Sequence, residues 1–342
     1  MTETNASDAP SDNSHDLRPL AHHPGGASPS KPLTTTHTAS SRPEPLPNPI
    51  NNDLTSPSTS DLPTTPPSLN YTVRTCPRLW WMAIFWTVTL IDSCILPITL
   101  YFTLHYLTSL SPNTVFSIVT GAIGGLSIVE YAIRSWRLWK SNSTCRPLGE
   151  PSRWAFDFFH WIYSFTWLIC MVELIVGSVP DEPYIRLLAL VPATFLYVFG
   201  LQLLLFDFMA RFGIRSPVPI SSQPRGEVPR NAVFTLVEDV VAVDGSAGTE
   251  YRERLLARYK ASETFRAMMQ TMTWFWGWGA LVTAVLTTVL AFALENKEVA
   301  YTQGWSVPFV WAMLWAALSW WYVERMLKVE REVWRGSKDV PV

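Results

Sequence analysis

Six polar side chains lie inside long apolar stretches of this sequence, and they are its main candidates for chemistry. They are Asp92, Glu130, Asp157, His160, Glu173 and Asp207. A charged group near the centre of a bilayer costs roughly 2.5–3.5 kcal/mol on insertion scales, so each such residue needs an explanation. Each could bind a cation, move a proton or act as an acid or a base.

Glu130 and Asp207 have a structural explanation. Arg134 follows Glu130 by four residues, and Arg211 follows Asp207 by four. Side chains with this spacing lie one turn apart on a helix, so each acid can form a salt bridge with its arginine. We therefore expect both acids to be paired toward the end of a helix.

Asp157 and His160 lie close to the start of an apolar stretch. From there their polar groups can reach the membrane surface. The alternative is an enzymatic site, because a lipid-modifying enzyme embedded in the membrane needs an acid and a base at one depth. Glu130, Asp157, His160 and Asp207 are the residues that such an enzyme could use.

Asp92 and Glu173 have no basic residue one turn away in the sequence. Both lie well inside stretches that run in the same direction across the membrane, so helical geometry brings them to comparable depths. Two carboxyls at one level could coordinate a cation or share a proton. Alternatively, each is protonated and bonded to a neighbouring hydroxyl or carbonyl group. Pro97 predicts a kink just beyond Asp92.

The rest of the composition offers no further chemistry. The 4 cysteines are scattered, without the spacing of a zinc site or of a disulfide framework. We therefore expect no metal and no cofactor. The net charge of -2 gives no indication of a nucleic-acid partner.

Six transmembrane helices are predicted to position these residues. Charged residues make up only 16% of the chain, and 17 tryptophans suit a protein with two membrane surfaces. The predicted spans are residues 79–107, 113–139, 155–179, 184–210, 273–294 and 304–327. Each exceeds the ~20 residues that cross the hydrocarbon core. The predicted fold class is all-α, a polytopic membrane bundle of six transmembrane helices within residues 77–335.

Basic residues predict the orientation of this bundle. Lys and Arg are numerous between the second and third spans, between the fourth and fifth, and after the sixth. The links on the opposite side carry only Arg186 and Lys297. Because basic residues collect on the cytosolic side of membrane proteins, both termini are predicted to be cytosolic.

Two regions outside the membrane are expected on the cytosolic side. Residues 1–73 are rich in Ser, Thr and Pro, and are predicted to be a disordered tail. Residues 211–273 form a loop with interfacial, amphipathic helices, and Ser262 is expected to cap the helix of the fifth span. This loop is either a structural collar or a surface for a protein partner. Its candidate contact residues are Glu238, Asp239 and Asp244.

Gly121 and Gly125 form a small-xxx-small pair in the second span. Such a pair allows two helix backbones to approach closely within a lipid bilayer. It predicts either a close helix contact inside the bundle or a homo-oligomer of two copies.

Several strings along the chain are similar to those of one protein family. They include DSCILPITLY, WRLWKSNSTCRPLG, VELIVGSVP, ISSQPRG and GWSVPFVWA. On these strings the chain resembles a family of uncharacterised multi-pass membrane proteins of filamentous fungi, over roughly residues 77–335. The resemblance implies a membrane topology and a fungal source. It implies no catalytic residue, because the family has no assigned activity.

Three function classes remain open from the sequence. The leading one is a non-enzymatic membrane adaptor or structural protein with a partner at the cytosolic loop. The alternative is a small-solute or ion transporter that uses Asp92 and Glu173. The third is a membrane-embedded lipid-modifying enzyme.

Overall fold

The computed structural model describes residues 65–72, 75–150 and 152–336. Within these ranges the chain is helical, and an isolated bridge between Ile220 and Gln223 is the one β contact. The elements are α1 (Cys76–Leu90), the π-helical η2 (Ile91–Ile95), α2 (Leu96–Leu107), α3 (Pro112–Trp139), α4 (Phe158–Ser178), α5 (Ile185–Leu188), α6 (Val191–Arg211), α7 (Ala232–Val243), α8 (Gly248–Ala261), α9 (Glu263–Ala293) and α10 (Lys297–Gly336). The predicted all-α fold class is confirmed.

Six helices of the described chain are long and apolar enough to cross a membrane. They are Pro77–Leu107, Pro112–Trp139, Phe158–Ser178, Val191–Arg211, Glu263–Ala293 and Lys297–Gly336. Their outward faces expose large apolar side chains, such as Val282 and Leu286 on α9. Soluble proteins rarely expose continuous apolar surface of this kind, so the helices indicate a multi-pass membrane protein.

The third and fourth spans begin further along the chain than predicted. The third span begins at Phe158, because Asp157 is the N-cap of α4. The fourth begins at Val191, with Pro192 in its first turn, where a missing N–H group costs no helical hydrogen bond. The residues assigned to its start form the separate short helix α5.

The first span contains one widened turn. The π-helical η2 lies between α1 and α2, directly before Pro97. Proline has no N–H group, and its ring displaces the carbonyl one turn back, so a wider turn accommodates it. The irregularity expected at Pro97 therefore takes the form of a π turn that contains Asp92.

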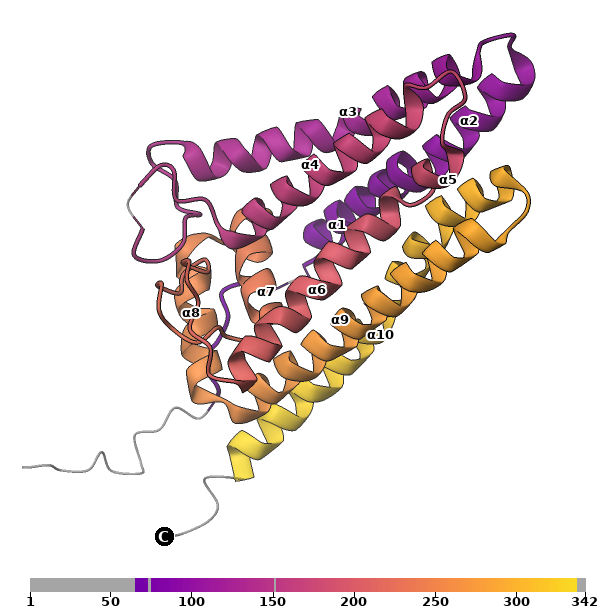
Figure 1. Cartoon of the computed structure of the whole chain (residues 1–342). Coiled ribbons are helices and arrows are strands. Elements are labelled where there is room, and N and C mark those ends of the chain that lie inside the picture. The colour runs from indigo at the N-terminus through magenta and orange to yellow at the C-terminus, as the bar shows by residue number, and fades with distance from the viewer. Residues whose placement is uncertain (1–64, 73–74, 151, 337–342) are drawn as a thin grey trace, which may run out of the picture. The chain divides into compact units, whose positions relative to one another are not determined.

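Three long helices form one side of the bundle. Figure 1 shows α6, α9 and α10 side by side, and α9 packs closely on both of its neighbours. Gly200 and Gly277 allow this approach, since a Cβ at Gly200 would lie 2.9 Å from the Gly277 carbonyl oxygen. α10 has 40 residues, or about 60 Å at the helical rise, which exceeds the ~30 Å hydrocarbon core.

A collar packs at one end of the bundle. We use this name for residues 140–157 and 212–262, which include α7 and α8 (Figure 1). α7 contacts α3, α4, α6, α8 and α9. Phe234 of α7 and Leu255 of α8 are fully buried in a cluster with apolar residues of α6 and α9. α10 reaches the same region, where Arg258 Nε donates to Glu330 Oε1 at 3.2 Å.

The packing of the collar bears on two predictions. In α8, Arg252 lies at 0% exposure whereas 42% of the Arg254 side chain is exposed, so an interfacial position of this helix stays a prediction. The tail predicted over residues 1–73 lies mostly outside the described residues. Its described part, residues 65–72, contacts the collar, where the rings of Tyr71 and Tyr251 are 5.9 Å apart. Ser262 caps α9 as predicted and accepts from the Phe265 N–H group.

Candidate functional site

A network of buried charged side chains lies where the collar meets the bundle. Its members come from α3, the N-cap of α4, α7 and α8, and they are Arg134, Asp157, Glu238, Asp239 and Arg252. None of them is more than 5% exposed. A buried charge is costly unless it is paired and hydrogen-bonded, so the contacts of these groups determine what they can do.

Asp157 joins the α3 and α4 spans. Its Oδ1 atom accepts from the backbone N–H of His160 at 2.8 Å, and its Oδ2 atom accepts from Arg134 Nη2 at 2.5 Å. The imidazole of His160 stacks between the rings of Tyr131 and Phe156, at 4.9 and 4.8 Å. Both side chains are buried and make contacts within the protein, so whether they lie at the depth of the membrane surface stays a prediction.

Arg252 is the centre of the network. Its Nη1 atom donates to Glu238 Oε1 at 3.0 Å and to Asp239 Oδ1 at 2.7 Å. Its Nη2 atom donates to the carbonyl oxygen of Cys145 at 3.0 Å, and lies 3.7 Å from Asp157 Oδ2. One guanidinium therefore ties α7, α8, the loop after α3 and the start of α4 together.

These contacts correct the prediction for the loop acids. Glu238 and Asp239 are 3% and 0% exposed, so they are not available to a partner protein. Every residue of α7 is buried or partly buried, and its acidic face points at Arg252 rather than at solvent. Asp244 is the loop acid that remains accessible, with 44% of its side chain exposed.

The first backbone N–H groups of α4, which have no acceptor within the helix, donate hydrogen bonds to this network. The Phe159 N–H donates to Asp239 Oδ2 at 3.1 Å, and the Phe158 N–H donates to Ser221 Oγ at 3.0 Å. Ser221 Oγ in turn donates to Asp239 Oδ2. A helix N-terminus carries partial positive charge, so it stabilises the carboxylates of Asp157 and Asp239.

The network holds more acid than base. Asp157, Glu238 and Asp239 face only two guanidinium groups, those of Arg134 and Arg252. Burial, together with the neighbouring Asp157 carboxylate, raises the pKa of Asp239 to about 7, although Arg252 opposes the shift. Asp239 therefore takes up a proton near neutral pH, which leaves Asp157 and Glu238, with Asp244 at the edge of the network, opposite the two arginines.

The spacing of four residues predicted a salt bridge between Glu130 and Arg134, but Arg134 has other partners. It bonds instead to Asp157 and, through Nη1, to Asp244. Arg137 contacts the same residue at the end of α7, since its Nη1 atom donates to the carbonyl oxygen of Asp244 at 3.2 Å. The predicted pair is lost because two acids distant in sequence lie closer to the guanidinium.

The pairing predicted for Asp207 is confirmed. Arg211 Nε donates to Asp207 Oδ2 at 2.8 Å, and Gln270 of α9 donates to Oδ1. Asp207 therefore bonds to α9, whereas Asp157 bonds to α3. The contacts do not draw the four residues considered for an enzyme into one site. No three His, Cys, Asp or Glu side chains of the described chain are placed to hold a metal ion.

Asp92 and Glu173 have separate surroundings. Glu173 accepts a hydrogen bond from Thr194 of α6 at 2.8 Å. Asp92 lies in η2, which packs on α3 and α10. A site shared by Asp92 and Glu173 stays a prediction, and no hydrogen bond or ion pair between these two described residues supports it.

Gly121 and Gly125 do not pack inside the described chain. A Cβ added at either position would meet nothing within 4 Å. Their face of α3 is therefore free to contact another helix, and the homo-oligomer stays a prediction.

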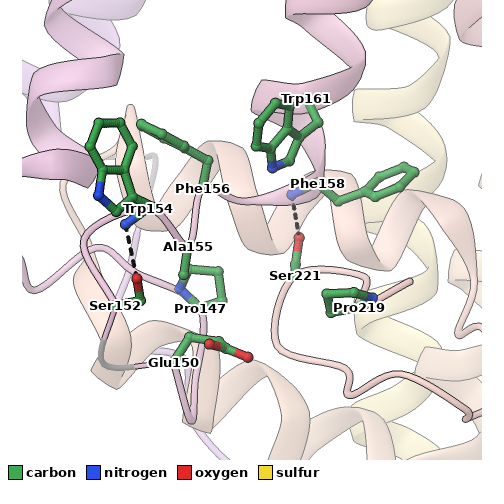
Figure 2. Close-up of a pocket in the computed structure, with 10 residues that line it drawn as sticks. All are labelled: Pro147, Glu150, Ser152, Trp154, Ala155, Phe156, Phe158, Trp161, Pro219 and Ser221. Atoms are coloured by element: carbon green, nitrogen blue, oxygen red, sulfur yellow. Dashed lines mark hydrogen bonds between the residues drawn. The ribbon is translucent and has the colours of Figure 1, made fainter. Parts of the chain in front are cut away.

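A cavity of about 300 Å³ opens beside the ion network (Figure 2). Aromatic rings and prolines make up most of its wall, and the lining residues are Pro147, Glu150, Ser152, Trp154, Ala155, Phe156, Phe158, Trp161, Pro219 and Ser221. Ser221 belongs to both features, because its hydroxyl oxygen lies at the wall and donates to Asp239. The sequence alone did not indicate this cavity, because it combines two loops that are distant in sequence with the start of α4.

A family model described as a domain of unknown function (DUF8766) matches residues 54–334. The matched range includes the collar, five of the long helices and all but the last two residues of α10. No curated protein and no solved structure matches the chain. The match agrees with the expectation of a family with no assigned activity.

Proposed function

The chain belongs to the DUF8766 family, a domain of unknown function, and from its own contacts we propose that it is a non-enzymatic membrane adaptor. The carrying observation is the buried ion network, in which Arg252 bonds to Glu238, Asp239 and Cys145 at once. A group that exchanges protons with a substrate needs access to it. The acids of the network are buried and have no access to a substrate, so they fit a structural role.

The network supports an adaptor because it makes the collar a fixed platform. Removing one partner of a buried ion pair costs about 3–5 kcal/mol of folding free energy, so separating the collar from α3 and α4 would be strongly unfavourable. A rigid surface lowers the entropy lost when a partner binds. We infer that the collar lies in the cytosol, as the distribution of basic residues predicts.

The outer face of α8 is the surface that we propose for the partner. Glu250, Glu253 and Lys260 are exposed there, whereas Arg252 and Leu255 point inward. Exposed charges steer encounters and set specificity more than they set affinity. Asp244 lies at the end of α7 and extends this surface.

The test is affinity purification of the full-length protein from its native membranes, followed by native mass spectrometry. We expect a stoichiometric partner that is lost from a Glu250→Lys/Glu253→Lys variant. The matched control is Glu295→Lys/Glu298→Lys, at the opposite end of the bundle, which should retain the partner. An isolated chain in the wild-type sample, or equal loss from both variants, would contradict the adaptor.

Ion or small-solute transport is the second candidate, and η2 favours it. π-helical turns occur often at functional sites, and this one contains Asp92 and packs on α3, the helix of Glu130. Two acids within a membrane span are a functional hypothesis by default. In proteoliposomes, Asp92→Asn should abolish cation flux in this case, whereas Glu253→Gln on α8 should leave it unchanged. The absence of any wild-type flux would remove the candidate.

A further inference from the structure

The lining of the collar cavity combines one negative charge with several aromatic rings. Glu150 is the one acidic or basic side chain among its ten lining residues. Trp154, Phe156 and Trp161 stand on the same side of it (Figure 2), and the Phe156 and Trp161 rings meet edge to face at 6.0 Å. Ring faces attract cations, and cages of aromatic side chains recognise quaternary ammonium groups. The lining therefore favours an organic cation.

The cavity lies at the level where the membrane surface is expected. Trp161 belongs to the first turn of the α4 span and is 58% exposed. Trp136 and Trp139, in the last turn of the α3 span, are also exposed, and the Trp139 ring contacts that of Trp154 at 6.4 Å. Exposed tryptophans concentrate at headgroup depth in membrane proteins. A lipid headgroup is thus the cation source nearest to this cavity.

The size of the cavity suits a headgroup rather than a whole lipid. Its volume of about 300 Å³ lies at the lower limit of small-molecule sites. The exposed position of Trp154 keeps one side open, so acyl chains can remain in the bilayer.

The wall opposite the rings is fixed by the ion network. Ser221 has a φ of 49°, an unfavourable value for a residue with a side chain. Its hydroxyl oxygen holds this conformation by accepting from the Phe158 N–H and donating to Asp239. Backbone strain of this kind clusters at ligand sites, where it pre-organises the wall.

We propose that this cavity binds the quaternary ammonium group of a choline-headed phospholipid. Trp154, Phe156 and Trp161 surround the methyl groups, and Glu150 supplies the counter-charge. The inference rests on the proposed function, since it anchors the platform to the membrane surface beside the partner-binding face.

The test is binding of dihexanoyl phosphatidylcholine to the full-length protein in a maltoside detergent, measured by calorimetry. We expect at least about tenfold tighter binding than for dihexanoyl phosphatidylglycerol, because the latter has no cation for the rings. Tetramethylammonium chloride should compete for the wild-type site, a measurement that needs no variant. Free choline that binds as tightly as the lipid would overturn the lipid source and assign the site to a soluble cation.

Variants locate the binding. Glu150→Gln should weaken phosphatidylcholine binding about tenfold, and Trp154→Ala about 3–30-fold, as expected for loss of a charge and of a cation–π contact. The controls are Glu295→Gln in the link after α9 and Trp86→Ala on α1, which are exposed and do not line the cavity. They should bind within twofold of wild type. Equal binding of the two lipids, or equal losses in the controls, would refute the site.

The two experiments distinguish failure of the adaptor proposal from failure of the headgroup site. If the partner is retained but the lipids bind equally, the headgroup site is wrong and the adaptor stands. If the lipid preference is found but no partner is captured from membranes, the adaptor is wrong and the cavity remains a lipid site.

Discussion

Arg252 shows how a single buried side chain can organise the end of a membrane bundle. It lies at 0% exposure and bonds to two acids and a backbone carbonyl. Arginine suits this position because its planar group carries five donors in a fixed geometry. Lysine could not reach α7 and the loop after α3 together.

Replacement of Arg252 is therefore expected to be severe. Arg252→Met should lower the free energy of unfolding by about 3–5 kcal/mol, because it leaves buried carboxylates without a counter-ion. The measurement is thermal unfolding in detergent. Arg254→Met is the control on the same helix, since Arg254 forms an exposed pair with Glu250 that is worth less than about 1 kcal/mol. Similar losses in the two variants would refute the central role of Arg252.

Asp239 gives the collar a dependence on pH with a defined sign. Its pKa is about 7 in the folded protein and about 3.9 in an unfolded chain, so the folded state binds more protons between these values. The stabilising contribution of its proton is lost as the pH rises through that window. The pKa of Asp244 is also raised, mainly because the surrounding protein desolvates its carboxylate even though 44% of the side chain is exposed, and this shift acts in the same direction.

The Asp239→Asn variant isolates this effect. Its Tm should be below that of wild type at pH 5, because the amide nitrogen replaces either Oδ2, the acceptor for the Phe159 N–H and Ser221, or Oδ1, the acceptor for Arg252. The difference should shrink toward pH 8, where wild type carries the additional buried charge. Thermal scans across this range measure it, with Glu253→Gln expected to follow wild type. A difference that stays constant with pH would show that Asp239 does not take up the proton.

Residue-scale prediction from the sequence succeeded where partners are close along one helix. The Asp207–Arg211 pair and the Ser262 cap follow from spacing alone. Glu238 and Arg252 belong to different helices, and their contact depends on how α7 and α8 pack, which no local pattern encodes. A signal was nevertheless present, because an acid directly before an apolar stretch, such as Asp157, is a typical N-cap.

At the scale of elements, hydropathy identified the six spans, but it did not describe their contacts. Gly304 of α10 is an example, because it lies directly against the backbone before α6. A Cβ there would overlap the Ala189 carbonyl oxygen and lie 2.9 Å from its carbonyl carbon. Gly121, the residue that the sequence singled out, has open space instead.

These two glycines give an element-scale prediction. Gly304→Ala should lower the free energy of unfolding by about 1–3 kcal/mol, because backbone must move to relieve the overlap. Gly121→Ala should leave stability unchanged or raise it by up to about 1 kcal/mol, since alanine favours the helix. Thermal unfolding of monodisperse protein compares them. A larger loss for Gly121→Ala would instead indicate that its face packs against a second copy, as the small-xxx-small pair predicts.

At the scale of the whole molecule, the arrangement of the helices and the distribution of charge together predict one topology. The six long helices connect two ends, and the collar occupies the end where α3 and α6 finish and α4 and α9 begin. That end carries most of the basic side chains, whereas the opposite end has Arg186 and Lys297 in its links. Arg186 Nη2 donates to the Leu294 carbonyl oxygen at 2.7 Å, at the C-terminal end of α9. The partial negative charge of this helix end stabilises the guanidinium and explains a basic residue on the less basic side.

This topology predicts which positions a membrane-impermeant maleimide can reach in intact cells. In a background without the native cysteines, Asp181→Cys in the link before α5 should be labelled directly, because the positive-inside rule places that link outside the cytosol. Lys260→Cys at the exposed end of α8 should be labelled only after the membrane is made permeable. Both positions are solvent-exposed, so a difference in labelling reports sidedness rather than burial. The reverse pattern would place the collar, and with it the cavity and the proposed partner surface, on the other side of the membrane.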